Sequence, residues 1–373
     1  SFTNSEDFSS CDVEETVRAI KIKENDDLVI YQDSVQWATS PLQESQAQDM
    51  LDHYSTYGKQ VIDQYFGGIS DINDDGKIVV FVTPVLEDFD NTVAFVWSGD
   101  FFPKTAQDGW GGCPASNQME MMRFNLNVIN RISQGDYQAL GTVVHETKHI
   151  SSLYKSIIRS DFYGTYYQPT WVEEGTAEIA EEVAARIAWA ATGGPAVGEM
   201  VTDADIDAFT PENYSIILVN AGTTGYLSSQ PNGVVVTPTG ASESHSVYGS
   251  GWHFHRWLGD AYGVPAGPLG EASLFRTLND SVTAVGVSGF LAQTGASSWG
   301  DLMEEYLRAI MLNATGAPQG PRAFTSYDFP GVNRTFTYDG KPSGDYPWPV
   351  NVFGDDTTQP FGTGTYFGPI GPS

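Results

Sequence analysis

The sequence predicts an α+β fold in which a buried strand precedes a series of amphipathic helices. Residues 77–83, Lys-Ile-Val-Val-Phe-Val-Thr, form a continuous apolar run of the kind that is buried on both faces of a sheet. Beyond Asp136, apolar residues instead recur at helical spacing. These two patterns divide the chain into an N-terminal α/β region and a mainly helical region.

The region before the helices reads as short strands and one long helix. Residues 14–24 and 28–32 are β-prone, and residues 43–65 carry apolar side chains at helical spacing. Residues 91–130 are rich in aromatic side chains and turns. We expect loops and short strands there, with a tight turn at 109–113.

Four helices are expected after residue 135. Asp136 is a candidate N-cap for the first. The second begins with the capping-box pattern Thr170-Trp-Val-Glu173 and ends at the Thr-Gly-Gly-Pro of 192–195. The last two are expected at about 244–262 and 298–312.

These elements predict three parts of the chain. Residues 1–150 form an N-terminal α/β lobe, and residues 151–315 form a helical lobe. Residues 316–373 are rich in Gly, Pro and aromatic residues and lack a helical period. We expect this extension to pack on the body as strands and loops.

Composition excludes several classes of partner. The chain has 373 residues, and 18 Lys and Arg against 47 Asp and Glu give a net charge of −29. This charge argues against nucleic acid and anionic membranes as partners. No apolar run is long enough to span a bilayer, so no membrane insertion is expected. A start at Ser1 fits a processed, secreted form, which we expect to be a monomer.

The two cysteines, Cys11 and Cys113, are expected to form a disulfide. They lack a CxxC spacing and lie far in sequence from the histidine pair described below, which argues against a zinc thiolate site. Two separate buried thiols are the alternative. A disulfide agrees with secretion, because such bonds persist in oxidising compartments.

The motif His145-Glu-Thr-Lys-His149 predicts a catalytic zinc site. Two His residues four positions apart share one face of a helix, with Cβ atoms about 6 Å apart, so both imidazoles can reach one ion. Glu146 can take a proton from water at the metal. Apolar neighbours indicate a buried face rather than a solvated one: Val143, Val144 and Ile150.

A third zinc ligand must come from elsewhere, because catalytic zinc takes three protein ligands and keeps one open position. Ser152 and Lys155 stand where the metzincin pattern needs a glycine and a histidine, which excludes that pattern. The remaining candidates are on the next helix: Glu173, Glu174 and Glu178. Glu173 fits the capping box, which leaves Glu174 as the expected ligand.

Glu178 lies one turn after Glu174 and is expected to accept a hydrogen bond from a zinc-bound His. The alternative for Glu178 is a solvated acidic face that it shares with Glu181. Both readings place these carboxylates on the helix that carries Glu174.

The combined motifs resemble the gluzincin superfamily, in which W-x-x-E-G-x-A carries the third ligand. That segment is here Trp171-Val-Glu-Glu-Gly-Thr-Ala-Glu178. Residues 248–263 are similar to the Tyr- and Gly-bearing helix that follows in several of these families. Hyicolysin-like secreted bacterial peptidases share the order of three motifs, found here at 71–77, 116–120 and 145–149.

The resemblance implies a thermolysin-like, two-lobed zincin fold and a peptide or protein substrate. Glu146 would assist the attack of zinc-bound water on the scissile carbonyl. The resemblance also implies an oxyanion donor on a later helix. Tyr248 is expected in that role, and His245 and His253 are the alternatives. The alternative for Tyr248 is a structural role, as a core aromatic residue that stacks with Trp252 four positions later. His255 is expected to be structural.

The segment 71–76 is a candidate calcium loop, with oxygen ligands from Asp71, Asn73 and Asp75 and with Gly76 at the sharp turn. Val82 stands where an EF-hand would place its last ligand, so the second half of such a loop is missing. A plain polar turn is the alternative.

The sequence thus predicts a secreted zinc peptidase. A zinc-retaining adhesin or binding module without turnover is one alternative, although Glu146 argues against it. The other is a metallohydrolase that acts on a non-peptide bond.

Overall fold

The structure is a computed structural model. It describes the chain apart from residues 5–10, 13–14, 88–91, 107–111, 159–166, 203, 206–244, 264–269, 282–283, 316–319, 330–336, 339–340 and 343–373. At residues 4, 245–250, 314–315, 337–338 and 341–342 it describes the backbone alone.

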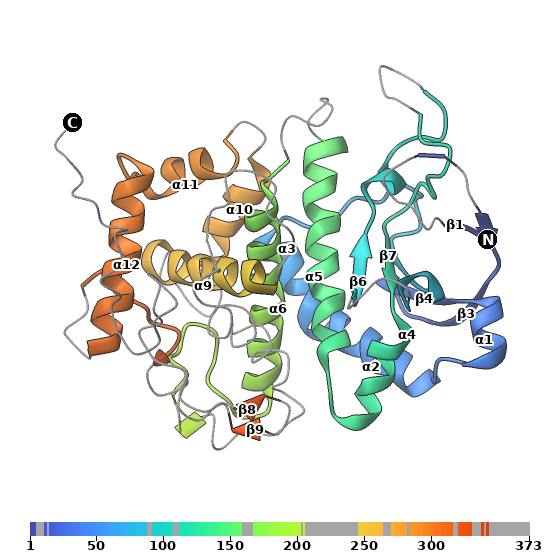
Figure 1. The fold of residues 1–373 in the computed structure, drawn as a ribbon, viewed down its shortest axis with the longest axis horizontal. Coiled ribbons are helices and arrows are strands. Elements are labelled where there is room, and N and C mark those ends of the chain that lie inside the picture. The colour runs from blue at the N-terminus through green and yellow to red at the C-terminus, as the bar shows by residue number, and fades with distance from the viewer. Residues whose placement is uncertain are drawn as a thin grey trace. The chain divides into compact units, whose positions relative to one another are not determined.

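A five-stranded mixed sheet forms the centre of the N-terminal part (Figure 1). Its order is β3-β4-β5-β7-β6, with β4, β5 and β7 parallel and the outer pairs β3–β4 and β6–β7 antiparallel. The strands are β3 Ala19–Glu24, β4 Leu28–Asp33, β5 Ile78–Val82, β6 Ala94–Val96 and β7 Met121–Phe124. A separate antiparallel pair joins β1 Phe2–Asn4 and β2 Glu15–Val17.

The central strand β5 is buried along its whole length, as its apolar run predicts. Each of its neighbours is parallel to it, which is the environment where strands lose the polar alternation of a half-exposed sheet. The α+β class is confirmed by this sheet together with the helices.

The N-terminal part contains the helices expected over 43–65 and after Asp136. It also contains two short helices that were not expected, at 34–39 and, where loops and short strands were predicted, at 126–130. The helices are α1 Ser34–Thr39, α2 Glu44–His53, α3 Lys59–Tyr65, α4 Leu126–Asn130 and α5 Gln138–Leu153. The pattern over 43–65 is one helical stretch, in which a π-helical turn, Tyr54–Gly58, joins α2 to α3. α5 packs against β6, β7 and α2 (Figure 1).

The later helices include two that the sequence pattern did not indicate. The helices are α6 Thr170–Ala191, α9 His245–Tyr262, α10 Ala272–Asp280, α11 Val287–Thr294 and α12 Trp299–Thr315. α10 and α11 have nine and eight residues, too short for a clear period. The short strands β8 Thr337–Tyr338 and β9 Lys341–Pro342 form an antiparallel pair.

The chain groups into two compact units. The first contains Ser1–Gln168, Val183–Ala185 and Phe275–Val285. The second contains Pro169–Glu182, Arg186–Leu274 and Gly286–Ser373. The helix α6 contributes to both, because its residues 183–185 group with the first unit.

Two predicted helix caps are wrong in detail. Tyr137, and not Asp136, occupies the N-cap of α5. Asp136 lies one residue before the N-cap and accepts a hydrogen bond from the backbone N–H of Gln138 at 3.0 Å. Pro169 occupies the N-cap of α6, so Thr170 is already helical and the capping box with Glu173 does not form. The extended backbone of Pro169 starts α6 instead.

The Cys11–Cys113 disulfide is present, with a Cα–Cα distance of 4.8 Å. It lies beside a small buried cluster that contains Trp97 and Ala115. None of the described helices is both long and apolar enough to cross a membrane.

Residues 322–326, in the described part of the C-terminal extension, contact α9. Asp260 accepts hydrogen bonds from the backbone N–H groups of Thr325 and Ser326, at 2.8 and 3.0 Å. The indole of Trp257 donates to the Arg322 carbonyl at 3.0 Å. Residues 330–336, 339–340 and 343–373 lie outside the described part.

Candidate metal centre

The residues 145–149 lie in the middle of α5 and are largely buried. His145 and Glu146 are 7% and 5% exposed, and Lys148 is 1% exposed. The rings of His145 and His149 have centroids 4.9 Å apart, as expected for two residues one turn apart on the same face. Helical spacing therefore places both imidazoles together.

Contacts within the first unit fix α5 at this motif. A Cβ on Gly58, in the π-helical turn, would lie 2.6 Å from Cγ2 of Val144, so only glycine permits this approach beside His145. A hydrogen bond joins the side chains of Tyr54 and Thr147. Thr147 also donates to the Val143 carbonyl at 2.7 Å. The motif is thus held from the side of α2 and α3.

The far end of α5 is held by hydrogen bonds from its serines. Ser151 donates to the carbonyls of Phe66 and Gly68, at 3.0 and 2.7 Å. Ser152 donates to Asn279 at 2.8 Å. Ser152 stands where a metzincin would need glycine, and here it has a structural partner.

The acidic candidates lie between residues 173 and 181 of α6. Glu174 is partly exposed, whereas Glu178 and Glu181 are 6% and 4% exposed. Glu178 and Glu181 therefore do not form a solvated acidic face. Buried carboxylates need compensating partners, which polar or cationic groups supply.

Two groups of side chains on α5 and α6 have the composition and spacing of a metal site. One ligand atom from each of His145, His149 and Glu174 lies within 4.8 Å of the others. A second group contains His145, Glu178 and Glu181, under the same distance limit. Glu173 belongs to neither group. The preference for Glu174 thus has support that does not depend on the capping box.

The first group has the donor chemistry of a zinc site. Two imidazole nitrogens and one carboxylate oxygen are a common ligand set for catalytic zinc, which leaves a fourth position open. His145 belongs to both groups. This fits a metal-ligating His, which binds the ion through one ring nitrogen and donates the N–H of the other to a carboxylate.

The candidates for an oxyanion donor are only partly described. Tyr248 and His245 lie in the first turns of α9, but their side chains fall outside the described part. His253 is 1% exposed, and its Nδ1 lies 2.6 Å from the Tyr306 hydroxyl. Burial lowers its pKa to about 3, so it is a neutral core residue.

His255 is fully buried, as its structural reading predicts. Its Nδ1 lies 2.7 Å from the Gly251 carbonyl, one helical turn earlier. Its ring lies among Trp171, Phe254 and Phe290.

The Asp71 loop has the hydrogen bonds of a tight polar turn. Asp71 accepts from the Gly76 N–H at 3.0 Å, and Asp75 accepts from Lys77 N–H and from Asn73, both at 2.8 Å. Asp74 has a φ of 57°. Calcium at this loop stays a prediction.

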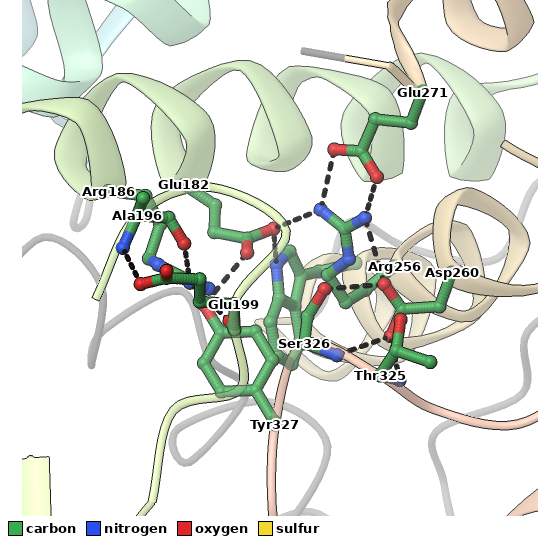
Figure 2. Close-up of polar contacts among 11 residues, drawn as sticks. Glu182, Arg186, Ala196, Glu199, Arg256, Asp260, Glu271, Thr325, Ser326 and Tyr327 are labelled. Atoms are coloured by element: carbon green, nitrogen blue, oxygen red, sulfur yellow. Dashed lines mark hydrogen bonds and ion pairs between the residues drawn. The ribbon is translucent and has the colours of Figure 1, made fainter. Parts of the chain in front are cut away.

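A buried charge network on α6 and α9 was not foreseen from the sequence (Figure 2). Arg256 forms ion pairs with Glu182, Asp260 and Glu271. Burial opposes the charge of Arg256, but these carboxylates raise its pKa well above the usual value. Residues from distant parts of the chain meet here, and no local motif indicates such a pairing.

No protein-family model matches this chain, and no curated protein matches its sequence significantly. The gluzincin resemblance therefore rests on the sequence motifs alone.

Proposed function

We propose that this protein is a secreted zinc-dependent peptidase whose metal is held by His145, His149 and Glu174. The observation that carries the proposal is the group of these three side chains, whose ligand atoms lie within 4.8 Å of one another. Their order along the chain and the segment 171–178 add the gluzincin resemblance. That resemblance extends the proposal to a two-lobed, thermolysin-like architecture.

Zinc in this site would supply a Lewis acid and would lower the pKa of water at its open position to about 7. Glu146 follows His145 on α5 and is 5% exposed. In this low-dielectric setting it would take the proton of the attacking water and pass it to the leaving amine. Glu178 or Glu181 would accept the second N–H of His145 and hold that ring in orientation.

Secretion is supported by the disulfide and by the charge of −29. The same charge favours basic or neutral substrates over acidic ones. Tyr248 is the proposed oxyanion donor, on the strength of its place at the start of α9.

Metal content of two neighbouring variants tests the ligand set. Glu174→Ala should abolish stoichiometric zinc retention after dialysis, because one of three protein ligands is lost. Glu173→Ala is the matched control, since it removes the adjacent carboxylate of the same helix turn. Zinc loss in Glu173→Ala together with retention in Glu174→Ala would overturn the assignment.

A further inference from the structure

The helices α6 and α9 cross at two glycines, Gly175 and Gly251. A Cβ added to Gly175 would lie 2.5 Å from Nδ1 of His255 and 2.8 Å from the carbonyl carbon of Gly251. A Cβ on Gly251 would lie 3.1 Å from Cα of Gly175 and from the Trp171 carbonyl oxygen. Residue 175 therefore has room for a hydrogen atom but not for a methyl group.

Glycine at these two positions lowers the stability of the helices, and close packing explains why it is present. Inside a helix, glycine is less stable than alanine by roughly 0.5–1 kcal/mol. The rest of α6 around Gly175 is rich in alanine, the strongest helix former: Ala177, Ala180 and Ala184 follow it. Its presence there is explained by the approach of the α9 backbone and of the His255 ring.

A second anchor joins the same two helices two turns later along α6. Glu182 accepts a hydrogen bond from the indole N–H of Trp252 at 3.0 Å. The Glu182 carboxylate also lies 3.4 Å from Nη1 of Arg256 (Figure 2). Trp252 is the residue after Gly251. Two anchors on one helix restrict both its rotation about its axis and its sliding along α9.

We propose that the Gly175–Gly251 crossing is a positioning device for Glu174, the metal ligand of the proposed function on which this inference rests. Glu174 is bonded directly to Gly175, so a displacement of α6 at the crossing moves its carboxylate. Metal–ligand distances tolerate only about 0.2 Å, whereas a new Cβ would force a shift of several tenths of an ångström or more. Gly175 acts through Glu174 and does not touch the metal.

The test measures zinc affinity and metal-free stability on the same variants. Gly175→Ala should weaken zinc binding by about 10- to 100-fold, the loss typical of residues that orient a ligand. Gly300→Ala is the matched control: this glycine also lies in a helix, α12, but its Cβ would meet only Ser298 Oγ at 3.6 Å. Zinc dissociation constants are read by competition with a chelating dye, at a temperature where each metal-free variant is folded by circular dichroism.

Unchanged zinc affinity in Gly175→Ala, with or without a lower unfolding temperature, would overturn the inference, because the crossing would then be packing alone. If Gly175→Ala does not fold, Gly251→Ala decides, since its closest contact of 3.1 Å demands a smaller adjustment. It should weaken zinc binding less than Gly175→Ala but more than Gly300→Ala; wild-type affinity would contradict the proposal. A wild-type protein without zinc affinity would instead remove the proposed function itself.

Discussion

Glu182 of α6 accepts a hydrogen bond from the indole nitrogen of Trp252 of α9, with a donor–acceptor distance of 3.0 Å. Its other carboxylate oxygen accepts from the Tyr327 hydroxyl at 2.8 Å. Glu182 therefore joins α6, α9 and the segment after α12 through one buried carboxylate (Figure 2).

Replacing Glu182 with Ala should destabilise the fold by about 3–5 kcal/mol, because it leaves two buried donors without an acceptor and removes a counter-charge from Arg256. Glu182→Gln keeps an acceptor and should cost less. Urea unfolding measures both. Asp63→Ala is the control, because its ion pair with Lys59 is exposed and should contribute under about 1 kcal/mol. A similar small loss in Glu182→Ala would contradict the role of the network.

Stability should fall as the pH falls below about 6.5, in part because of His253. Burial holds its pKa at about 3 in the folded protein, so between pH 6.5 and 3 the unfolded chain binds a proton that the folded chain does not. The contribution of neutral His253 to the free energy of unfolding is therefore complete above pH 6.5. As the pH falls below 6.5, this free energy decreases by up to about 1.4 kcal/mol per pH unit.

The variant His253→Gln isolates this effect. The difference in unfolding free energy between wild type and variant should shrink by about 2 kcal/mol from pH 7 to pH 5. Glutamine keeps a polar partner for Tyr306, so the comparison concerns titration. A difference that is the same at both pH values would show that His253 is not the source of the slope.

Removal of the disulfide should destabilise the folded protein substantially. Cys11 and Cys113 are 102 positions apart, and closing a loop of that length restricts the unfolded chain by about 4–5 kcal/mol on the chain-entropy model. The double variant Cys11→Ser, Cys113→Ser should therefore unfold at a markedly lower temperature in calorimetry. Wild-type protein treated with a reductant should behave like the variant, and equal unfolding temperatures would contradict the prediction.

Local patterns predicted the elements whose signal lies in a single segment. The apolar run at 77–83 became the buried strand β5, and the period after Asp136 became α5 with its histidines on one face. The start of α6 was misjudged, because Thr170 and Glu173 match a capping box in sequence while Pro169 takes the N-cap. Sequence spacing does not show which residue adopts extended backbone geometry.

Features that depend on distant residues were beyond local reasoning. Glu182 and Arg256 are 74 positions apart, and several acidic residues of α6 were equally plausible partners. Gly175 did carry a usable signal, since a glycine inside an alanine-rich helix indicates a close approach by another backbone. What the sequence lacked was the identity of that backbone, which is α9 at Gly251.

The most direct test of the central claim compares wild type with Glu146→Gln for zinc content and for digestion of casein and a peptide library. Glutamine has nearly the same shape but cannot accept the proton, so it should leave zinc binding intact. The account predicts zinc in both proteins and peptide cleavage by the wild type alone, with loss of activity in the variant by a factor of at least about 100. Zinc in both proteins with no peptide cleaved by either would contradict the peptidase and would favour a binding module.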